Sequence, residues 1–246
     1  MSGADILKPG LDRLARRSAD HDWNALAAAL DENGFATLET LLTPAECFEL
    51  VSLYGQDRLF RNHVHMARHG FGKGEYRYFH YPLPEPVGAL RTSLYPHLAG
   101  IANAWNTRMN AAQRFPEHHA DFLASCRASG QSRPTPLLLR YGPGDYNCLH
   151  QDLYGELVFP LQITVLLSDP GMDFTGGEFV LTEQRPRMQS RATVVPLAQG
   201  DAVIFAVNHR PVHGARGTHR VSFRHGVSHI RSGQRYALGI IFHDAP

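Results

Sequence analysis

The feature that most restricts the fold of this chain is a series of short β-rich runs in its second half. Each run is dominated by apolar, β-branched or aromatic residues, and Gly, Pro or Asp separates it from the next. The runs are TPLLLRY (135–141), LVFPLQITVLLS (157–168), GGEFVLTE (176–183), ATVVPL (192–197), DAVIFAV (201–207), RVSFRHGV (220–227) and RYALGIIF (235–242). Short strands separated by turn residues are typical of an antiparallel sandwich or jelly roll. We therefore expect an antiparallel sandwich or a jelly roll in this half of the chain.

The first half of the chain carries mainly helical patterns. The segment DWNALAAALDENG (22–34) is rich in alanine and ends at Gly34, a residue that favours helix termination. A second helix is predicted after Thr43, because Thr43 is a preferred N-cap, Pro44 takes the first helical position and Glu46 completes a capping box.

The whole pattern predicts an α+β protein. With 246 residues and 43% hydrophobic content, the chain can bury one sizeable core, so we expect a single domain over residues 1–246. In this domain, residues 1–134 provide mainly helical support and a lid, and residues 135–246 form the β core. The other segments of the first half are a short strand at 35–39, an irregular, aromatic and basic region at 61–86, and a helical region from about Pro96 to Gly130.

A candidate metal-binding pair follows a Gly-Pro-Gly turn in the stretch RYGPGDYNCLHQDLYGE. His150 and Asp152 are two residues apart, so on a strand they face the same side and can chelate one cation, while the residue between them points away. With the numbers of histidine and aspartate in this chain, about one pair of a histidine and an aspartate two residues apart is expected by chance. His119 and Asp121 form a second pair, but their segment has a helical pattern, in which residues two apart face different directions. We therefore favour the pair at 150 and 152.

A second histidine is needed to complete a site of two histidines and one carboxylate, which leaves open positions on iron(II) for dioxygen and a chelating cosubstrate. His225 shares one apolar face of its predicted strand with Val221, Phe223 and Val227, as an inward-facing ligand would. His213 lies near Pro and Gly, which favour a loop. A histidine bonded to a backbone carbonyl in the core is the alternative interpretation of His225. The downstream candidates are His209, His213, His219, His225 and His229.

The motifs RYGPGDYNCLHQD, FTGGEF, GDAVIF and HGVSHIRSGQRYALGIIFHD, taken in order, resemble the iron(II)- and 2-oxoglutarate-dependent dioxygenase superfamily over about residues 135–246. The resemblance implies a double-stranded β-helix, with His150, Asp152 and His225 as the metal ligands and catalytic residues. It also implies an arginine about ten residues after the distal histidine. Arg235 stands at that spacing, which favours His225 over His213.

The resemblance further implies a cosubstrate site. A planar guanidinium such as that of Arg235 can bind the remote carboxylate of 2-oxoglutarate bidentately. The alternative for Arg235 is a solvent-facing position in a hairpin. Tyr141 resembles a cosubstrate-contacting tyrosine, and Gln162 and Thr164 are further candidate cosubstrate contacts. The cofactors implied are Fe(II), 2-oxoglutarate and O2, with ascorbate in a supporting role, for hydroxylation of a substrate C–H bond.

The substrate implied most directly is a nucleic acid with an alkylated base. The histidine motif is similar to that of bacterial alkylation-repair demethylases, and the chain resembles a bacterial group predicted to oxidise methyl groups on damaged bases. The aromatic and basic segment RHGFGKGEYRYFHY (68–81) suits base stacking and phosphate binding. Its candidate substrate-binding residues are Arg68, Tyr76, Arg77 and Tyr78. A packed lid or a solvated face is the alternative for this segment.

Other classes of function stay open. The repair enzymes have an Asn two residues and a second Arg six residues beyond the cosubstrate arginine, and this chain has Ala237 and Ile241 there. The ending HGVSHIRSGQR equally resembles the prolyl hydroxylase branch, so hydroxylation of a protein side chain or a small molecule is an alternative. A non-enzymatic cupin-like metal-binding module is a second alternative, and an adaptor with an inactive barrel is a third.

Charge and cysteine content place further limits on the protein. From Arg185 onward the chain has nine arginines and two aspartates, an excess of +7 that could face an anionic partner; the arginines are 185, 187, 191, 210, 216, 220, 224, 231 and 235. Cys47, Cys126 and Cys148 form no CxxC motif and are expected to be buried free thiols. No signal peptide and no apolar run long enough to span a membrane are evident, so we expect a cytoplasmic protein without a membrane partner.

Overall fold

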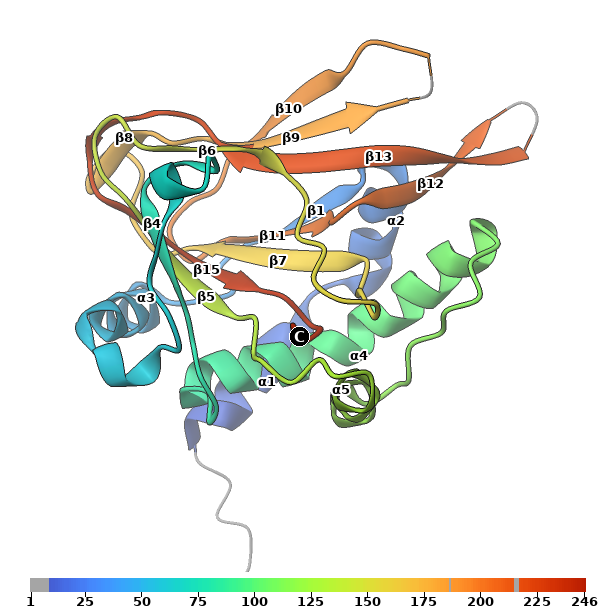
Figure 1. The fold of residues 1–246 in the computed structure, drawn as a ribbon, viewed down its shortest axis with the longest axis horizontal. Helices are drawn as coiled ribbons and strands as arrows, with labels where there is room; N and C mark the ends of the chain where they lie inside the picture. Colours follow the sequence, from blue (N-terminus) through green and yellow to red (C-terminus); the bar gives the residue numbers. More distant parts are fainter. Residues whose placement is uncertain (1–8, 186, 215–216) are drawn as a thin grey trace, which may run out of the picture.

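Two antiparallel sheets with a cavity between them form the centre of the protein (Figure 1). The computed structural model describes residues 9–185, 187–214 and 217–246. The major sheet contains, in spatial order, β1 (Phe35–Leu38), β11 (Ala202–Ala206), β7 (Leu161–Leu166), β15 (Arg235–Ile240), β5 (Leu137–Tyr141), β4 (Glu75–Tyr78) and β2 (Val64–His65).

The minor sheet contains β10 (Arg191–Val195), β9 (Phe179–Gln184), β13 (Gly217–Val227), β6 (Tyr146–His150) and β3 (Gly72–Lys73), with β12 (His209–Gly214) also paired to β13. Two further strands, β8 (Phe174–Gly176) and β14 (Ile230–Gly233), pair with each other. Each of the seven runs predicted as β structure contains a strand of one of the two main sheets. The predicted α+β class with a jelly-roll core is therefore confirmed.

Helices cover the outer side of the major sheet (Figure 1). They are α1 (Pro9–Asp20), α2 (Trp23–Asn33), α3 (Pro44–Ser52), α4 (Glu85–Arg108) and α5 (His119–Ala128), with short 3₁₀ turns η1 (Leu53–Gly55), η2 (Asp57–Leu59) and η3 (Met66–Arg68). The predicted capping box of Thr43 and Glu46 is present at α3, and Gly34 ends α2 in the left-handed region. No helix of the described residues is both long and apolar enough to cross a bilayer.

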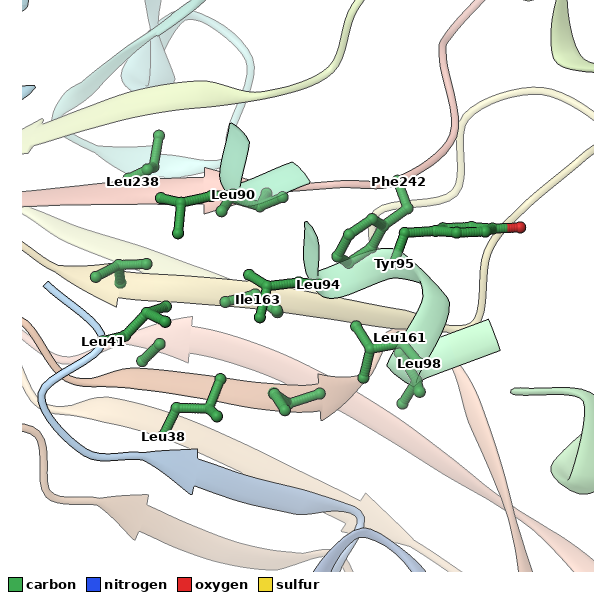
Figure 2. Close-up of a cluster of buried hydrophobic side chains, with 14 of the residues drawn as sticks. Leu38, Leu41, Leu90, Leu94, Tyr95, Leu98, Leu161, Ile163, Leu238 and Phe242 are labelled. Atoms are coloured by element: carbon green, nitrogen blue, oxygen red, sulfur yellow. The ribbon is translucent and has the colours of Figure 1, made fainter. Parts of the chain in front are cut away.

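The main hydrophobic core lies between α4 and the major sheet. Leu90, Leu94 and Leu98 are four residues apart, so they share one face of α4. Figure 2 shows this face against β7, which carries Leu161 and Ile163, and all five side chains are buried. Full burial of a leucine or isoleucine stabilises a fold by about 1.5–3 kcal/mol, so this contact holds the major sheet rigidly against its helical support.

The boundaries predicted around α4 are wrong. The helix begins at Glu85 rather than near Pro96, and a loop separates it from α5. Pro96 lies inside the helix, although proline usually marks a helix start. The buried residues Val87, Leu90 and Leu94 precede it, so burial of the apolar face outweighs the lost backbone hydrogen bond.

The prediction of an irregular region at 61–86 is also wrong. This region contains β2, β3 and β4, and β4 pairs with β5 from Glu75 opposite Arg140 to Tyr78 opposite Leu137. The major sheet therefore extends beyond the C-terminal runs. The predicted strand at 35–39 is confirmed by β1, so residues 1–134 supply strands to both sheets besides their helices.

Candidate active site

The two histidines and the aspartate of the predicted metal site lie together at one end of the β6–β13 pair. Strand β6 ends at His150, and cross-strand register places His225 of β13 directly opposite. Their ring centroids are 4.1 Å apart. Asp152 follows in the loop, with Oδ1 3.5 Å from His150 Nε2 and Oδ2 3.4 Å from His225 Nε2. One donor atom from each residue lies within 4.8 Å of the others. We call these three residues the central cluster.

Local features of β6 and β13 bring these residues together. The side chain of Gln151 turns away from Asp152 and donates hydrogen bonds to Phe223 O at 2.7 Å and Asn208 Oδ1 at 2.8 Å. Gly226 lies against β6, where an added Cβ would approach Asn147 O to 2.7 Å. A larger residue at 226 would therefore push the strand that carries His225 away from β6.

The central cluster has the electrostatics of a cation site. Burial would raise the pKa of Asp152, but hydrogen bonds from His150 and His225 hold it well below its usual range. Burial lowers the pKa of His225, and the nearby His150 lowers it further. Burial also opposes protonation of His150, but Asp152 outweighs it and raises the pKa of His150. Two imidazole nitrogens and one carboxylate are a donor set that suits iron(II), so the residues present fit such an ion.

A cavity of about 320 Å³ adjoins the central cluster between the two sheets. The predicted cosubstrate residues Arg235, Tyr141, Gln162 and Thr164 all line it. Arg235 is 1% exposed, and its Nε has no hydrogen-bond partner among the described residues. Burial lowers the pKa of this guanidinium. A buried cation that forms no ion pair within the described chain is costly, so an anionic ligand in this cavity would offset the cost.

The predicted substrate residues separate into two groups. Tyr76 and Tyr78 line the cavity. Arg77 alternates with them on β4 and points elsewhere, where it pairs with Asp57 at 2.5 Å. Arg68 is exposed in η3 and is not among the lining residues. The geometry therefore brings the two tyrosines to the cavity and leaves both arginines outside it.

Sequence reasoning missed Tyr154, another residue of the cavity wall. Its hydroxyl donates to Asp152 Oδ1 at 2.7 Å. Burial and the adjacent carboxylate raise the pKa of Tyr154, which keeps the hydroxyl protonated at neutral pH. The available signal was the continued alternation of polar residues at 150, 152 and 154.

The other candidate histidines, His119 as the alternative to His150 and His213 as the alternative to His225, lie outside the central cluster. His119 is buried on α5, where its Nε2 lies 2.8 Å from Phe242 O and burial lowers its pKa to about 3. His213 lies in β12, opposite Thr218 of β13, so the prediction of a loop around His213 is wrong. Strand β12 pairs only with β13 in the described chain, and Pro211 is tolerated because an edge strand can lack a donor.

Two expectations about surface chemistry need correction. Cys47 and Cys126 are buried, but Cys148 on β6 is exposed and is among the residues that line the cavity. The C-terminal arginine excess is partly internal, because Arg210 is buried in a pair with Glu183 at 2.7 Å and Arg235 faces the cavity. Residue 216, one of the nine arginines, lies outside the described residues.

A second group of two histidines and one carboxylate, which we call the edge cluster, lies at β2 and β4. Glu75 Oε2 is 2.6 Å from His63 Nε2 and 3.5 Å from His65 Nδ1. Arg77 NH2 lies 3.4 Å from His63 Nδ1, which makes Nδ1 the acceptor and Nε2 the nitrogen that donates to Glu75. Arg140 also pairs with Glu75. The carboxylate of the edge cluster is therefore already neutralised and hydrogen-bonded by the protein.

Solved structures with a similar fold are oxygenases. An oxidoreductase of the 2OG-Fe(II) oxygenase family from Burkholderia pseudomallei is similar with a TM-score of 0.55 and 16% identity, covering 92% of this chain and 94% of that chain. A Pseudomonas putida prolyl-4-hydroxylase is similar with a TM-score of 0.53 and 13% identity, covering 91% and 100%. The fold is therefore that of the 2-oxoglutarate and iron(II) oxygenases.

Sequence comparison defines the family more closely. A model of the Oxygenase-NA family, described as an oxygenase catalysing oxidative methylation of damaged DNA, matches residues 74–245. The chain belongs to this family, which confirms the predicted oxygenase class. Two proteins of Mycobacterium tuberculosis, from strains CDC 1551 / Oshkosh and ATCC 25618 / H37Rv, are each 53% identical over 164 residues, covering 67% of this chain and 70% of theirs. Both carry the name uncharacterized protein.

Proposed function

We propose that this oxygenase uses iron(II) and 2-oxoglutarate to hydroxylate a substrate C–H bond. His150, Asp152 and His225 would hold the metal, and Arg235 would bind the remote carboxylate of 2-oxoglutarate. The observation that carries this proposal is that the central cluster and a buried guanidinium without an acidic partner in the described chain line the same cavity. When bound, the metal supplies activation of dioxygen at the open positions that two histidines and one carboxylate leave.

The protein's own groups orient the reactants. Tyr141 lies beside the guanidinium, with its ring centroid 5.7 Å from Arg235 Cζ, and Gln162 and Thr164 of the neighbouring strand add polar groups to the same wall. Arg235 is surrounded by the aromatic rings of Tyr141 and Phe174, so water is largely excluded from the ion pair it would form. This low-polarity surrounding strengthens a charge-assisted, bidentate hydrogen bond.

We propose a nucleic acid base with an N-methyl group as the substrate. Oxidation by one O2 and one 2-oxoglutarate would convert N–CH3 to N–CH2OH and release succinate and CO2; the N–CH2OH group then loses formaldehyde and leaves N–H. The family description of damaged DNA supports this substrate. Tyr76 and Tyr78 also support it, because aromatic rings in the cavity wall can stack on an extruded base.

The experiment supplies Fe(II), 2-oxoglutarate, O2 and ascorbate together with a single-stranded oligonucleotide containing an N-methylated base. We expect succinate and formaldehyde in equal amounts, with no formaldehyde from the unmethylated oligonucleotide. The variant His225→Ala is the control for metal-dependent turnover. Succinate release without formaldehyde from any methylated oligonucleotide would contradict the nucleic acid substrate while leaving the oxygenase chemistry intact.

The second candidate is hydroxylation of a prolyl or other protein side chain, or of a small molecule. Ala237 and Ile241 favour it, because they replace the two polar residues that nucleobase demethylases have after the cosubstrate arginine, and both are buried. Binding to single-stranded DNA separates the candidates. A nucleic acid enzyme should bind with an affinity that falls steeply as salt is raised, whereas a small-molecule hydroxylase should show no such binding.

A further inference from the structure

A chain of tyrosine hydroxyls leads from the cavity wall to the carboxylate of the central cluster. Tyr78 donates to the hydroxyl of Tyr154 at 2.9 Å, and Tyr154 donates to Asp152 Oδ1 at 2.7 Å. The second carboxylate oxygen, Oδ2, faces His225 Nε2 at 3.4 Å. The hydroxyl of Tyr154 therefore holds Oδ1, which also lies 3.5 Å from His150 Nε2, and leaves Oδ2 beside His225.

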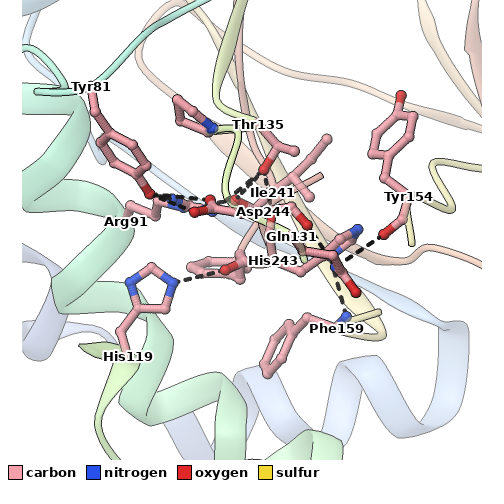
Figure 3. Close-up of polar contacts among 12 residues, drawn as sticks. Tyr81, Arg91, His119, Gln131, Thr135, Tyr154, Phe159, Ile241, His243 and Asp244 are labelled. Atoms are coloured by element: carbon pink, nitrogen blue, oxygen red, sulfur yellow. Dashed lines mark hydrogen bonds and ion pairs between the residues drawn. The ribbon is translucent and has the colours of Figure 1, made fainter. Parts of the chain in front are cut away.

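The backbone that carries Tyr154 is fixed from behind by Gln131, which is 1% exposed. The amide nitrogen of Gln131 donates to the carbonyls of Tyr154, Leu157 and Asp244, and its oxygen accepts from the backbone nitrogens of Glu156 and Leu157, at distances from 2.6 to 3.3 Å. Figure 3 shows this contact, with the ring of Tyr154 pointing away from it.

The turn after Tyr154 leaves little freedom for movement. Gly155 has a positive φ of 78°, and an added Cβ would approach the Gln131 side chain to 2.4 Å. Gln131 is itself bonded to the backbone of Asp244, whose carboxylate pairs with buried Arg91 at 2.8 Å (Figure 3). The hydroxyl of Tyr154 is thus aimed at Asp152 by a rigid, buried network rather than by a flexible loop.

We infer that Tyr154 is a positioning residue that, through its hydrogen bond to Oδ1, fixes the orientation of the Asp152 carboxylate between the two imidazoles of the central cluster. This inference rests on the proposed metal site. Groups that hydrogen-bond to a metal ligand fix its orientation, and their loss typically weakens metal binding about 10- to 100-fold. Without the hydroxyl, the carboxylate could rotate, and its two oxygens would leave the positions that they hold beside His150 and His225.

The test compares Tyr154→Phe with wild type for binding of Mn2+ or Co2+ alone, measured by equilibrium dialysis. We expect about 10- to 100-fold weaker binding in the variant and a changed visible spectrum of bound Co2+. The matched control is Tyr236→Phe, which removes a hydroxyl that donates to exposed Gln234. That variant should bind the metal as wild type does.

A second variant keeps the test decisive if Tyr154→Phe does not fold. Tyr78→Phe removes only the outer donor of the chain, so metal binding should weaken measurably but by less than about 10-fold. Equal metal affinity and equal Co2+ spectra in wild type, Tyr154→Phe and Tyr78→Phe would overturn the inference and leave the metal site intact. A wild-type protein that binds neither ion would instead overturn the proposed function, and the positioning role with it.

Discussion

The central cluster and the edge cluster contain the same types of residue but differ in what surrounds the carboxylate. In the central cluster, the contacts of Asp152 within the described chain are the two imidazoles and the hydroxyl of Tyr154, and no arginine pairs with it. In the edge cluster, Arg140 pairs with Glu75, and Arg77 contacts the far nitrogen of His63. Donor types alone therefore do not distinguish a cation site; the charge balance around the carboxylate does.

The largest difference between the clusters should follow from removing one histidine of each. His225→Ala should weaken Mn2+ binding at least ~100-fold and abolish succinate release, because loss of a ligand costs more than loss of an outer hydrogen bond. His63→Ala should retain one bound Mn2+ per chain. Equilibrium dialysis measures the bound metal in both variants. Loss of the metal from His63→Ala and its retention by His225→Ala would contradict the distinction between the two clusters.

A change at Arg235 should separate cosubstrate binding from metal binding. Hydrogen bonds to charged groups contribute about 1.5–3 kcal/mol, so Arg235→Ala should raise KM for 2-oxoglutarate about 10- to 100-fold. Mn2+ affinity should stay that of wild type, since Arg235 does not belong to the central cluster. Succinate release at varied 2-oxoglutarate concentration measures this effect. An unchanged KM would show that the buried guanidinium serves another ligand.

In the edge cluster, the expected effect is on stability. Burial would raise the pKa of Glu75, but His63 and Arg140 lower it below the ordinary value of 4.5. A carboxylate with a lowered folded-state pKa stabilises the fold above pH 4.5, and this contribution is lost as the pH falls through the folded-state pKa. Glu75→Gln should therefore reduce the free energy of unfolding by about 1–3 kcal/mol at pH 7.

The pH dependence of that loss is the sharper measurement. Urea unfolding of Glu75→Gln and wild type at pH 7 and at several values below 4.5 should show the difference between them shrinking as the pH falls. A difference that stays constant with pH would mean that the charge of Glu75 contributes nothing to the edge cluster.

The smallest effect is expected at His65. Its side chain is 45% exposed, and its Nδ1 is 3.5 Å from Glu75 Oε2, a long contact. His65→Asn should change the free energy of unfolding by no more than about 0.5 kcal/mol and leave the Mn2+ stoichiometry unchanged. Urea unfolding measures the free energy of unfolding, and equilibrium dialysis of the same preparation measures the Mn2+ stoichiometry. Loss of one bound Mn2+ per chain would indicate that the edge cluster binds a cation.

The seven strand runs could be predicted from the sequence because each is apolar, short and bounded by turn residues. Strand β4 was missed because its residues, Glu75–Tyr78, are polar and aromatic, and their alternation becomes apparent only once β5 is alongside. The start of α4 was missed because burial of one face overrides the usual position of proline. Tertiary packing determines both the pairing of β4 and the start of α4, and the local composition of these segments does not show it.

For the candidate site, the sequence indicated His150, Asp152 and His225 because an alternating pattern and family motifs both point to them. Tyr154 continues the alternation of residues 150 and 152, but its contact with Asp152 and the support from Gln131 depend on the turn at Gly155, so both residues were missed. Arg77, a candidate substrate-binding residue, lies outside the cavity, because neighbouring residues on a strand face opposite sides and the strand register could not be known from the sequence.

The cross-strand pairing of His150 with His225 links residues 75 positions apart in the chain. A shift of one residue in that register would turn the second imidazole to the opposite face of the sheet. During synthesis, a chain that has not yet extended past residue 225 has only part of the central cluster. The three side chains therefore come together only after β13 has paired with β6 in the correct register. A truncated or mispaired chain cannot form the central cluster.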